Sequence, residues 1–243
     1  MELVRRLDAA GRVVFFIGAG ASTEPPSCIP DFRSAQGLWR DRELMAALSR
    51  DYFSRDPVHF WELFGRIFLP WAHAQPNAVH RAPGRLAALG KQLTVVTQNI
   101  DGLDRLCSTG YPVFELHGNL RGATCPRCGK TSAAESYPAD GPPRCACRRV
   151  LKPDVVLFGD PLDYEGTLRP AREAIDAAEL LLVVGTSLTV APANLLVAER
   201  AGTCPMVILN RDPTPCDRLA CLVLRESAGA LLSTALDLLE AGR

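Results

Sequence analysis

Residues 97–128 read TQNIDGLDRLCSTGYPVFELHGNLRGATCPRC, and this stretch governs how the rest of the chain is interpreted. The polar cluster Gln98-Asn99-x-Asp101 directly follows the apolar run Leu93–Val96. His117 comes sixteen residues after Asp101, beside a glycine, and a Cys-x-x-Cys pair opens eight residues later. Polar groups at a strand end, one histidine at a turn and a metal-type cysteine pair together predict a catalytic cleft beside a metal-held module.

Three further short apolar runs end in small or polar residues, which is typical of strands buried on both faces of a parallel sheet. They are Val13–Ile17 before Gly18-Ala19-Gly20, Leu180–Val184 before Gly185-Thr186-Ser187, and Met206–Leu209 before Asn210. Helical patterns alternate with them at residues 2–10, 191–201 and 228–241. We therefore expect an α/β fold, a Rossmann-like doubly wound parallel sheet that binds ligands at the carboxyl ends of its strands.

Two stretches interrupt this alternation. Residues 24–75 begin with prolines and continue into helical sequence, whereas residues 121–150 are rich in Cys, Pro and Gly and poor in apolar side chains. We expect a single catalytic domain over residues 1–243, with a smaller lobe inserted into it. Residues 24–75 would form its helical part and residues 121–150 its zinc-binding module.

Composition narrows the class of protein. The chain has 243 residues, 47% hydrophobic and 22% charged, with 27 basic and 27 acidic side chains. This balance predicts no direct binding of nucleic acid, and no apolar run approaches the roughly 18 residues of a membrane helix. A signal peptide is disfavoured because Glu2 and Asp8 precede a very short apolar core. We expect a cytoplasmic monomer.

The nine cysteines include two close pairs with the spacing C-x2-C-x16-C-x-C: Cys125, Cys128, Cys145 and Cys147. Zn²⁺ takes four such ligands in a tetrahedron, so the quartet predicts a structural zinc site. The alternative is two pairs of redox-active or unbound thiols. A catalytic zinc is disfavoured because four cysteine ligands leave no position for water.

The turn Gly18-Ala19-Gly20 is suited to cradling a phosphate, because glycine allows an anion to approach the backbone closely. An ordinary dehydrogenase is disfavoured, since Thr23 stands where the third glycine of the dinucleotide fingerprint is expected. Among the four histidines, His59 and His73 have no chemical context and His80 is interpreted as a packing residue. His117 ends an apolar run beside a glycine turn, which favours a general base.

At this point the chain resembles the sirtuin family, in its compact prokaryotic form. The resemblance rests on GAGAS (18–22 with flanking strand), IPDFRS (29–34), GLW (37–39), TQNID, ELHGNL and the four cysteines in this order. It continues through LKPDVVLFGD (151–160), VVGTSLTVAPAN (183–194) and Leu209-Asn210, so it covers almost the whole chain.

The resemblance implies an NAD-dependent protein-lysine deacylase that acts on acyl-lysine proteins or peptides. The products would be nicotinamide, O-acyl-ADP-ribose and free lysine. Mono-ADP-ribosyl transfer or NAD glycohydrolysis on the same fold stays open as an alternative, as does a non-catalytic NAD-binding module, which the presence of His117, Asn99 and Asp101 disfavours.

The resemblance also implies roles for individual residues. His117, Asn99 and Asp101 would be catalytic, with His117 removing a proton from a ribose hydroxyl. Val155, Val156, Phe158 and Gly159 would hold the substrate peptide and its acyl-lysine. NAD would be bound by Gly18, Ala19, Gly20, Ser22, Asp31, Phe32, Arg33, Trp39, Gln98, Asn99, Ile100, Asp101, Gly185, Thr186, Ser187, Asn210 and Ala228.

This chain departs from the family pattern in places. Pro25-Pro26 lengthens the segment before Ile29, and Cys28 replaces a glycine, so NAD affinity or turnover is expected to differ. Pro83-Gly84 is expected to interrupt the helix after His80. Phe64 and Ile67 align with the Tyr and Arg of desuccinylating relatives, which predicts acetyl or apolar acyl groups over succinyl or malonyl, unless Arg66 supplies the cation.

Overall fold

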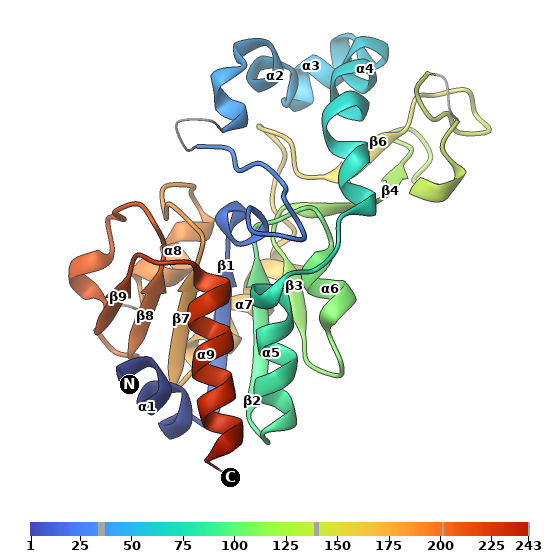
Figure 1. Cartoon of the computed structure of the whole chain (residues 1–243). Coiled ribbons are helices and arrows are strands. Elements are labelled where there is room, and N and C mark those ends of the chain that lie inside the picture. The colour runs from blue at the N-terminus through green and yellow to red at the C-terminus, as the bar shows by residue number, and fades with distance from the viewer. Residues whose placement is uncertain (34–36, 139–140, 201, 243) are drawn as a thin grey trace.

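The larger lobe is built on a six-stranded parallel sheet with the strand order β3-β2-β1-β7-β8-β9 (Figure 1). The computed structural model describes residues 1–33, 37–138, 141–200 and 202–242. The strands are β1 (Arg12–Ile17), β2 (Gln92–Thr97), β3 (Val113–Glu115), β7 (Leu180–Val184), β8 (Met206–Leu209) and β9 (Leu222–Leu224). The chain moves outward from β1 to β3 and returns to the other side of β1 with β7, so a ligand crevice is expected at the carboxyl ends of these two central strands.

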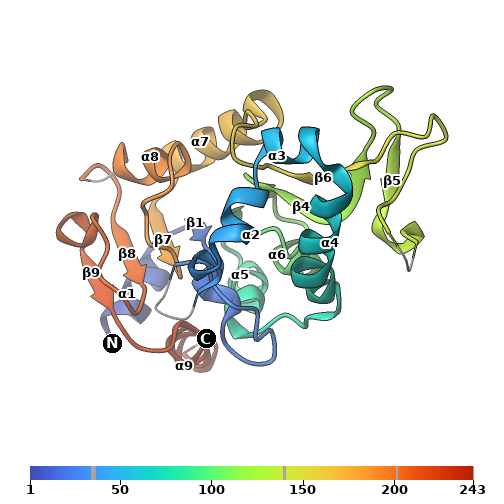
Figure 2. The same ribbon diagram turned by 90° about the horizontal axis from the view of Figure 1, so that it is seen from above.

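Helices cover both faces of this sheet (Figure 2). One face carries α1 (Glu2–Ala9), α5 (Ala78–Ala88) and α9 (Ala228–Ala241), and the other carries α7 (Arg169–Asp176) and α8 (Ala193–Ala198). Successive strand residues serve opposite cores, since Phe15 packs under the first set and Phe16 under the second. This double burial explains the continuous apolar runs. No helix of the described residues is both long and apolar enough to cross a membrane.

The smaller lobe combines three helices with a three-stranded antiparallel sheet in the order β5-β4-β6. Asp41, Ser49 and Asp56 cap the helices by accepting hydrogen bonds from backbone N–H groups three residues on. Its core is aromatic, with Phe60 and Phe64 packed against the sheet. The elements are α2 (Arg42–Ala47), α3 (Arg50–Arg55), α4 (Pro57–Phe68), β4 (Gly118–Thr124), β5 (Thr131–Ala133) and β6 (Lys152–Val155).

Short segments complete the fold. Helix α6 (Leu103–Cys107) packs against α5, and a π-helical turn at Tyr164–Leu168 leads into α7. Single 3₁₀ turns occupy Ala19–Ser22, Leu38–Arg40, Leu69–His73, Ala134–Ser136 and Asp217–Leu219. The helix predicted over residues 191–201 is shorter, because α8 begins only after Pro192.

The expectation that Pro83-Gly84 interrupts a helix is wrong, because α5 runs through both residues. Asn77 accepts hydrogen bonds from the N–H groups of Val79 and His80, and the His80 ring accepts one from the Asn77 N–H. This capping box fixes the start of the helix. An interior proline costs a helix about 3 kcal/mol, and the cap together with burial of the Pro83 ring offsets that cost.

Candidate active site

A cavity of about 800 Å³ lies between the carboxyl ends of the sheet strands and the smaller lobe. It is lined by strand-end residues of the larger lobe, by the segment around β6 and by helix α4. Of the residues expected to bind NAD or catalyse, the following line it: Gly18, Ala19, Gly20, Asp31, Phe32, Arg33, Gln98, Asn99, Ile100, His117, Gly185, Thr186, Ser187 and Asn210. All four expected substrate residues also line it.

The floor of the cavity is formed where the turn after β1 meets the turn after β7. Gly20 N–H donates to the Gly185 carbonyl oxygen at 2.8 Å. A Cβ atom on Gly18 would lie 2.6 Å from the Thr186 Cβ, and one on Gly185 would lie 2.2 Å from the Ala21 nitrogen. Glycine is therefore required for the two turns to approach each other, and the resulting strip of bare backbone suits the close approach of an anionic phosphate.

Asn99 is held at the edge of this floor and is 6% exposed. Its side-chain amide donates to the Gly18 carbonyl and to the Ser22 hydroxyl, both at 3.2 Å. Its side-chain oxygen is buried and has no hydrogen-bond partner among the described residues. A buried acceptor without a donor is costly, and a ligand hydroxyl would satisfy it. The donor set and the orphan oxygen fit the ribose of a nucleotide.

Behind Asn99 lies a polar network that sequence reasoning only partly anticipated. The Ser22 hydroxyl donates to Asp101 at 2.7 Å and contacts the His80 Nε2 at 3.2 Å. Burial lowers the pKa of His80 to about 4, with the nearby Arg81 acting in the same direction, so its ring is neutral near pH 7. The packing role expected for His80 missed this contact, because Ser22 is 58 residues away in the sequence.

His117 projects into the same cavity from the turn after β3. Its Nδ1 lies 3.0 Å from the Gln98 carbonyl oxygen. A carbonyl can only accept, so Nδ1 carries the proton and Nε2 keeps a lone pair in the neutral ring. Burial lowers the pKa of His117, and the bond to Gln98 opposes this shift only in part. The result is a neutral imidazole that can accept a proton at Nε2.

The strand expected to bind substrate is connected to His117 through the main chain. The Val156 N–H donates to the His117 carbonyl at 2.9 Å. A Cβ on Gly118 would lie 2.0 Å from the Asp154 carbonyl oxygen, so this close approach requires glycine. The Phe158 N–H and C=O are already paired with Leu48 and Arg50 of the smaller lobe. Main-chain contacts to a peptide therefore have to come from neighbouring residues.

The smaller lobe gives the cavity an aromatic wall. Phe64 and Phe68 lie one turn apart on α4, with ring centroids 4.7 Å apart, and both line the cavity together with Leu48. Ile67 is partly buried, whereas Arg66 is exposed and does not line the cavity. Tyr164, Leu168 and Val190 complete the apolar side. Val190 lies within the quoted stretch 183–194, whereas no short motif in the sequence points to Tyr164 or Leu168.

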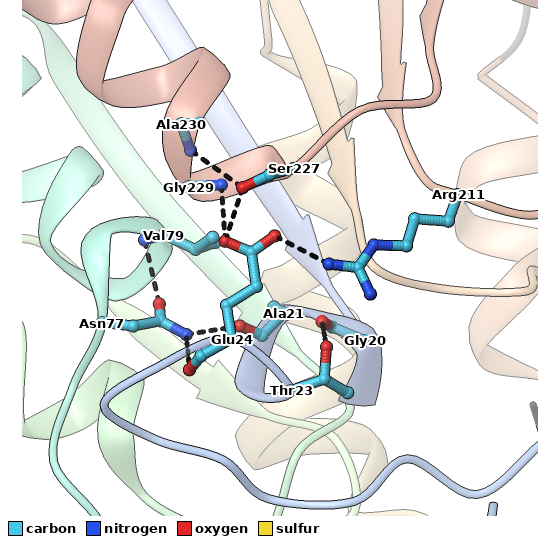
Figure 3. A network of polar contacts seen from close by, with 10 residues as sticks. All are labelled: Gly20, Ala21, Thr23, Glu24, Asn77, Val79, Arg211, Ser227, Gly229 and Ala230. Carbon is cyan, nitrogen blue, oxygen red and sulfur yellow. Dashed lines mark hydrogen bonds and ion pairs between the residues drawn. The ribbon is translucent and has the colours of Figure 1, made fainter. Parts of the chain in front are cut away.

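The segment that enters the cofactor loop is anchored to the C-terminal helix (Figure 3). The Glu24 carboxylate accepts hydrogen bonds from the Ser227 hydroxyl at 2.9 Å and the Gly229 N–H at 3.1 Å, at the start of α9. Arg211 lies 3.8 Å from its other oxygen, and Asn77 donates to the Glu24 carbonyl. The anion at the helix N-terminus is favourable because the helix dipole is positive there.

Cys28, expected from the resemblance to stand in place of a glycine, has φ of 52° and so lies in the left-handed region. A residue with a side chain is strained there, typically by about 1–2 kcal/mol. The backbone shape of the turn is therefore the one that glycine would adopt without strain.

The four cysteines converge at the turns flanking β4 and β6. All their sulfur atoms lie within 4.8 Å of one another, with Cys125 and Cys147 at 3.6 Å and Cys128 and Cys145 at 3.5 Å. Four soft ligands at these separations fit a tetrahedral zinc ion. Four cysteine ligands leave no open coordination position for water, so the site fits a structural zinc ion.

Three residues of the expected cofactor site, Ser22, Asp101 and Ala228, do not line the cavity. Ser22 and Asp101 lie behind Asn99 and reach the cavity only through it. Ala228 is the first residue of α9 and is buried in the core on that face of the sheet. The side chain of Trp39 lies outside the described part of the structure. Their roles in NAD binding stay predictions.

Comparison with known proteins agrees with this geometry. Residues 18–192 match the sequence profile of the Sir2 family. The chain is 44% identical over 236 residues to an NAD-dependent protein deacetylase of Chromobacterium violaceum, with 94% of each chain covered. It is 42% identical over 237 residues to that of Bacillus subtilis, with 92% of this chain and 93% of the relative covered.

Solved structures give the same result. A Sir2 structure with a deacetylated p53 peptide and 3′-O-acetyl-ADP-ribose superimposes with a TM-score of 0.87 at 31% identity, covering 99% of this chain and 97% of that chain. Sir2Tm bound to a propionylated peptide has a TM-score of 0.85 at 30% identity, covering 99% and 98%. The matched family residues and the long alignments agree, and the chain belongs to the Sir2 family, the sirtuins.

Proposed function

We propose that this sirtuin is an NAD-dependent protein-lysine deacetylase that binds NAD on the strand-end side of the cavity and an acyl-lysine peptide on the aromatic side. The observation that carries the proposal is the placement of the His117 ring and the buried Asn99 amide on one cavity wall, beside the glycine floor. The names of the relatives support the same activity.

The strand-end side supplies groups suited to NAD. Gly18 and Gly20 offer bare backbone for the phosphates, and Asn210 at the end of β8 marks the adenosine end. The unpartnered Asn99 oxygen would accept from a ribose hydroxyl. NAD, when bound, supplies a sugar carbon that is activated for displacement of nicotinamide. The protein's part is to hold that carbon facing the acyl oxygen and to keep water away.

His117 moves the proton in this scheme. Its Nδ1–H is fixed on the Gln98 carbonyl, so Nε2 is the atom that accepts a proton from a ribose hydroxyl. The lowered pKa keeps the ring neutral and ready to accept at neutral pH. Loss of the Gln98 contact would let the ring turn and exchange its nitrogens.

The acyl group would lie against Phe64, Phe68 and Leu48. Among the described lining residues the only guanidinium is that of Arg33, which belongs to the cofactor loop. An anionic succinyl or malonyl group would therefore be buried without a cation, which is unfavourable. This supports acetyl and apolar acyl groups as the preferred substrates.

The four cysteines would hold one zinc ion, with no part in the proton or acyl transfer. Its contribution is to tie together the turns of residues 121–150, which have few apolar side chains of their own. We further propose that residues 24–75 and 121–150 together form the smaller lobe. We propose that the enzyme acts as a monomer in the cytoplasm, where its nine cysteines, none of which forms a disulfide, would stay reduced.

The test is the mass of the products formed from NAD and matched acetyl- and succinyl-lysine peptides. We expect free lysine peptide, nicotinamide and O-acetyl-ADP-ribose, with slower turnover of the succinyl peptide. Nicotinamide with ADP-ribosylated protein or free ADP-ribose, and no deacetylated peptide, would instead indicate transferase or glycohydrolase activity.

A variant separates catalysis from folding in this assay. His117→Ala should lower kcat by about 10²–10⁴-fold with little change in NAD affinity, because it removes a proton acceptor. His59→Ala is the matched control, since His59 is a partly exposed histidine on α4. Unchanged turnover in His117→Ala would refute the role of this residue.

A further inference from the structure

Asp104 is a buried acid for which the proposed function has no role. It lies on α6 and is 3% exposed. Neither of its carboxyl oxygens has a hydrogen-bond partner in the part of the chain that the structure describes. A buried carboxylate without partners is strongly unfavourable, so a cause is needed for an acid at this position.

Two other carboxyl groups face Asp104. Asp101 accepts hydrogen bonds from the Leu103 N–H at 2.9 Å and from the Ser22 hydroxyl at 2.7 Å. Both terminal nitrogens of Arg121 donate hydrogen bonds to the carboxylate of Glu115 on β3, at 2.7 and 2.5 Å. Glu115 therefore has its own cation, while Asp101 and Asp104 share a buried environment in which the described residues place no cation between them.

The hydrogen bonds decide which member of this pair holds a proton. Donors stabilise a carboxylate, so Asp101, with two donors, is the member that ionises. Asp104 has only the nearby Thr97 hydroxyl, which lies outside hydrogen-bonding geometry, and keeps the proton. In agreement, burial and then the Asp101 charge raise the pKa of Asp104 to about 7, and the nearby Thr97 hydroxyl only partly opposes this.

The remaining groups around Asp104 do not change charge near neutral pH. On α5, His80 is neutral because its pKa is lowered to about 4, and Arg81 is an exposed cation. Burial raises the pKa of the Cys107 thiol and raises that of Tyr111 to about 12, so both stay protonated. Asp104 is thus the group poised to exchange a proton.

The pair is linked to the cavity by a short chain of contacts. Asp101 accepts from Ser22, and Ser22 accepts from the Asn99 amide, which lines the cavity. Thr97, which faces Asp104, also accepts from the Asn99 N–H at 3.2 Å. The nicotinamide ring of NAD carries a positive charge, and a cation in a buried site favours ionisation of a nearby acid.

We propose that Asp104 is a positioning residue that stores the single proton of the Asp101–Asp104 pair and releases it when the cationic nicotinamide ring of NAD enters the cavity. The inference rests on the proposed function, because it requires that NAD bind beside Asn99. When the ring departs as neutral nicotinamide, its charge is gone and the carboxylate of Asp104 takes a proton back from solvent.

Burying the Asp104 carboxyl lowers the free energy of unfolding at neutral pH. The folded state keeps a proton on Asp104 at pH values where the unfolded chain has lost it, so stability falls as pH rises from about 4 to about 7. An amide of the same shape would avoid this loss. An acid kept at such a position is a marker of function.

Calorimetry of NAD binding tests the proposal directly. Titrations near pH 7 in buffers of different ionisation enthalpy give the number of protons released. The wild-type protein should release a substantial fraction of one proton, and its NAD affinity should rise by up to about tenfold per pH unit across this range. Asp104→Asn should release correspondingly less, and its affinity should depend less on pH.

Two further variants complete the experiment. Asp104→Ser should repeat the result through a second uncharged side chain, and Asp8→Asn, the same change at an exposed position of α1, should behave as wild type. Without NAD, the melting temperature of Asp104→Asn should gain on wild type as the pH rises from 5 to 8. Equal proton release by wild type and both Asp104 variants would overturn the proposal. Absence of NAD binding by the wild-type protein would instead refute the proposed function itself.

Discussion

The two lobes that face each other across the cavity are each stabilised internally, and by different interactions. The larger lobe has aliphatic cores on both faces of a parallel sheet, and its site residues sit on the strand ends themselves. The smaller lobe has an aromatic core, short helices and four clustered cysteines. The strand-end wall is thus positioned by backbone pairing, whereas the acyl wall depends on side-chain packing and on a metal.

This difference teaches where the enzyme is vulnerable. Backbone ladders tolerate the loss of single side chains, but a module with few apolar residues has little else to hold it when its metal is lost. The segment from Glu24 to Cys28 connects the two lobes, because it leaves the larger lobe and leads toward the smaller one. Three changes test the comparison, in order of decreasing effect.

The largest effect is expected from loss of the zinc site. Structural zinc contributes about 10–16 kcal/mol in isolated zinc-finger peptides, so Cys128→Ser should lose the metal and loosen the smaller lobe. We expect turnover to fall by at least about 100-fold while NAD binding and the larger lobe's unfolding transition persist. Metal content, activity and thermal unfolding measure these three properties.

The matched control is Cys221→Ser, since Cys221 is an exposed thiol that donates to the Met206 carbonyl in the larger lobe. It should retain metal and activity. A zinc-free Cys128→Ser protein with full activity, or one in which both lobes unfold together, would break the distinction between the lobes.

A smaller effect is expected where the cofactor loop is tied to α9. Glu24→Ala removes an anion that accepts two hydrogen bonds, each worth about 1.5–3 kcal/mol when one partner is charged. We expect a free energy of unfolding lower by about 3 kcal/mol, the low end for the two bonds together, and a higher KM for NAD with kcat less affected. Glu226→Ala, at an exposed neighbouring position, is the control. Equal stability of the two variants would show that the contact carries no energy.

The smallest effect concerns Cys28, and it should be a gain. Replacing a strained left-handed residue by glycine relieves about 1 kcal/mol, less the extra freedom that glycine has in the unfolded chain. Cys28→Gly should therefore be slightly more stable than wild type in denaturant unfolding. Cys28→Ala removes the thiol but keeps the Cβ, and a gain of the same size in that variant would rule out backbone strain as the cause.

The same contrast explains what the sequence could predict. The four central strands, the glycine turns after β1 and β7, and the cysteine quartet are local patterns, and each appears in the structure where the sequence places it. Asn99 and His117 could be identified from the sequence for the same reason, because each lies at the end of an apolar run. The strand ends of a parallel sheet meet at one edge, so their convergence followed from the fold class.

The remaining features depend on contacts between distant segments. His80 was interpreted as packing because nothing near it in the sequence announces Ser22, and Asp104 is one acid among 27 until its burial is known. The predicted interruption of the helix at Pro83-Gly84 was wrong because local propensity was outweighed by a capping box and a buried ring. Tyr164 and Leu168 join the cavity wall only through tertiary packing.

The hydrogen bond from the Val156 N–H to the His117 carbonyl has a mechanical consequence. This hydrogen bond joins His117 directly to the segment proposed to bind the peptide. Beside it, Gly118 packs so closely against Asp154 that there is no room for a side chain. A peptide that stiffens this strand thereby also stiffens the seat of the imidazole. We therefore expect docking of the peptide and alignment of the His117 ring to be coupled through this hydrogen bond.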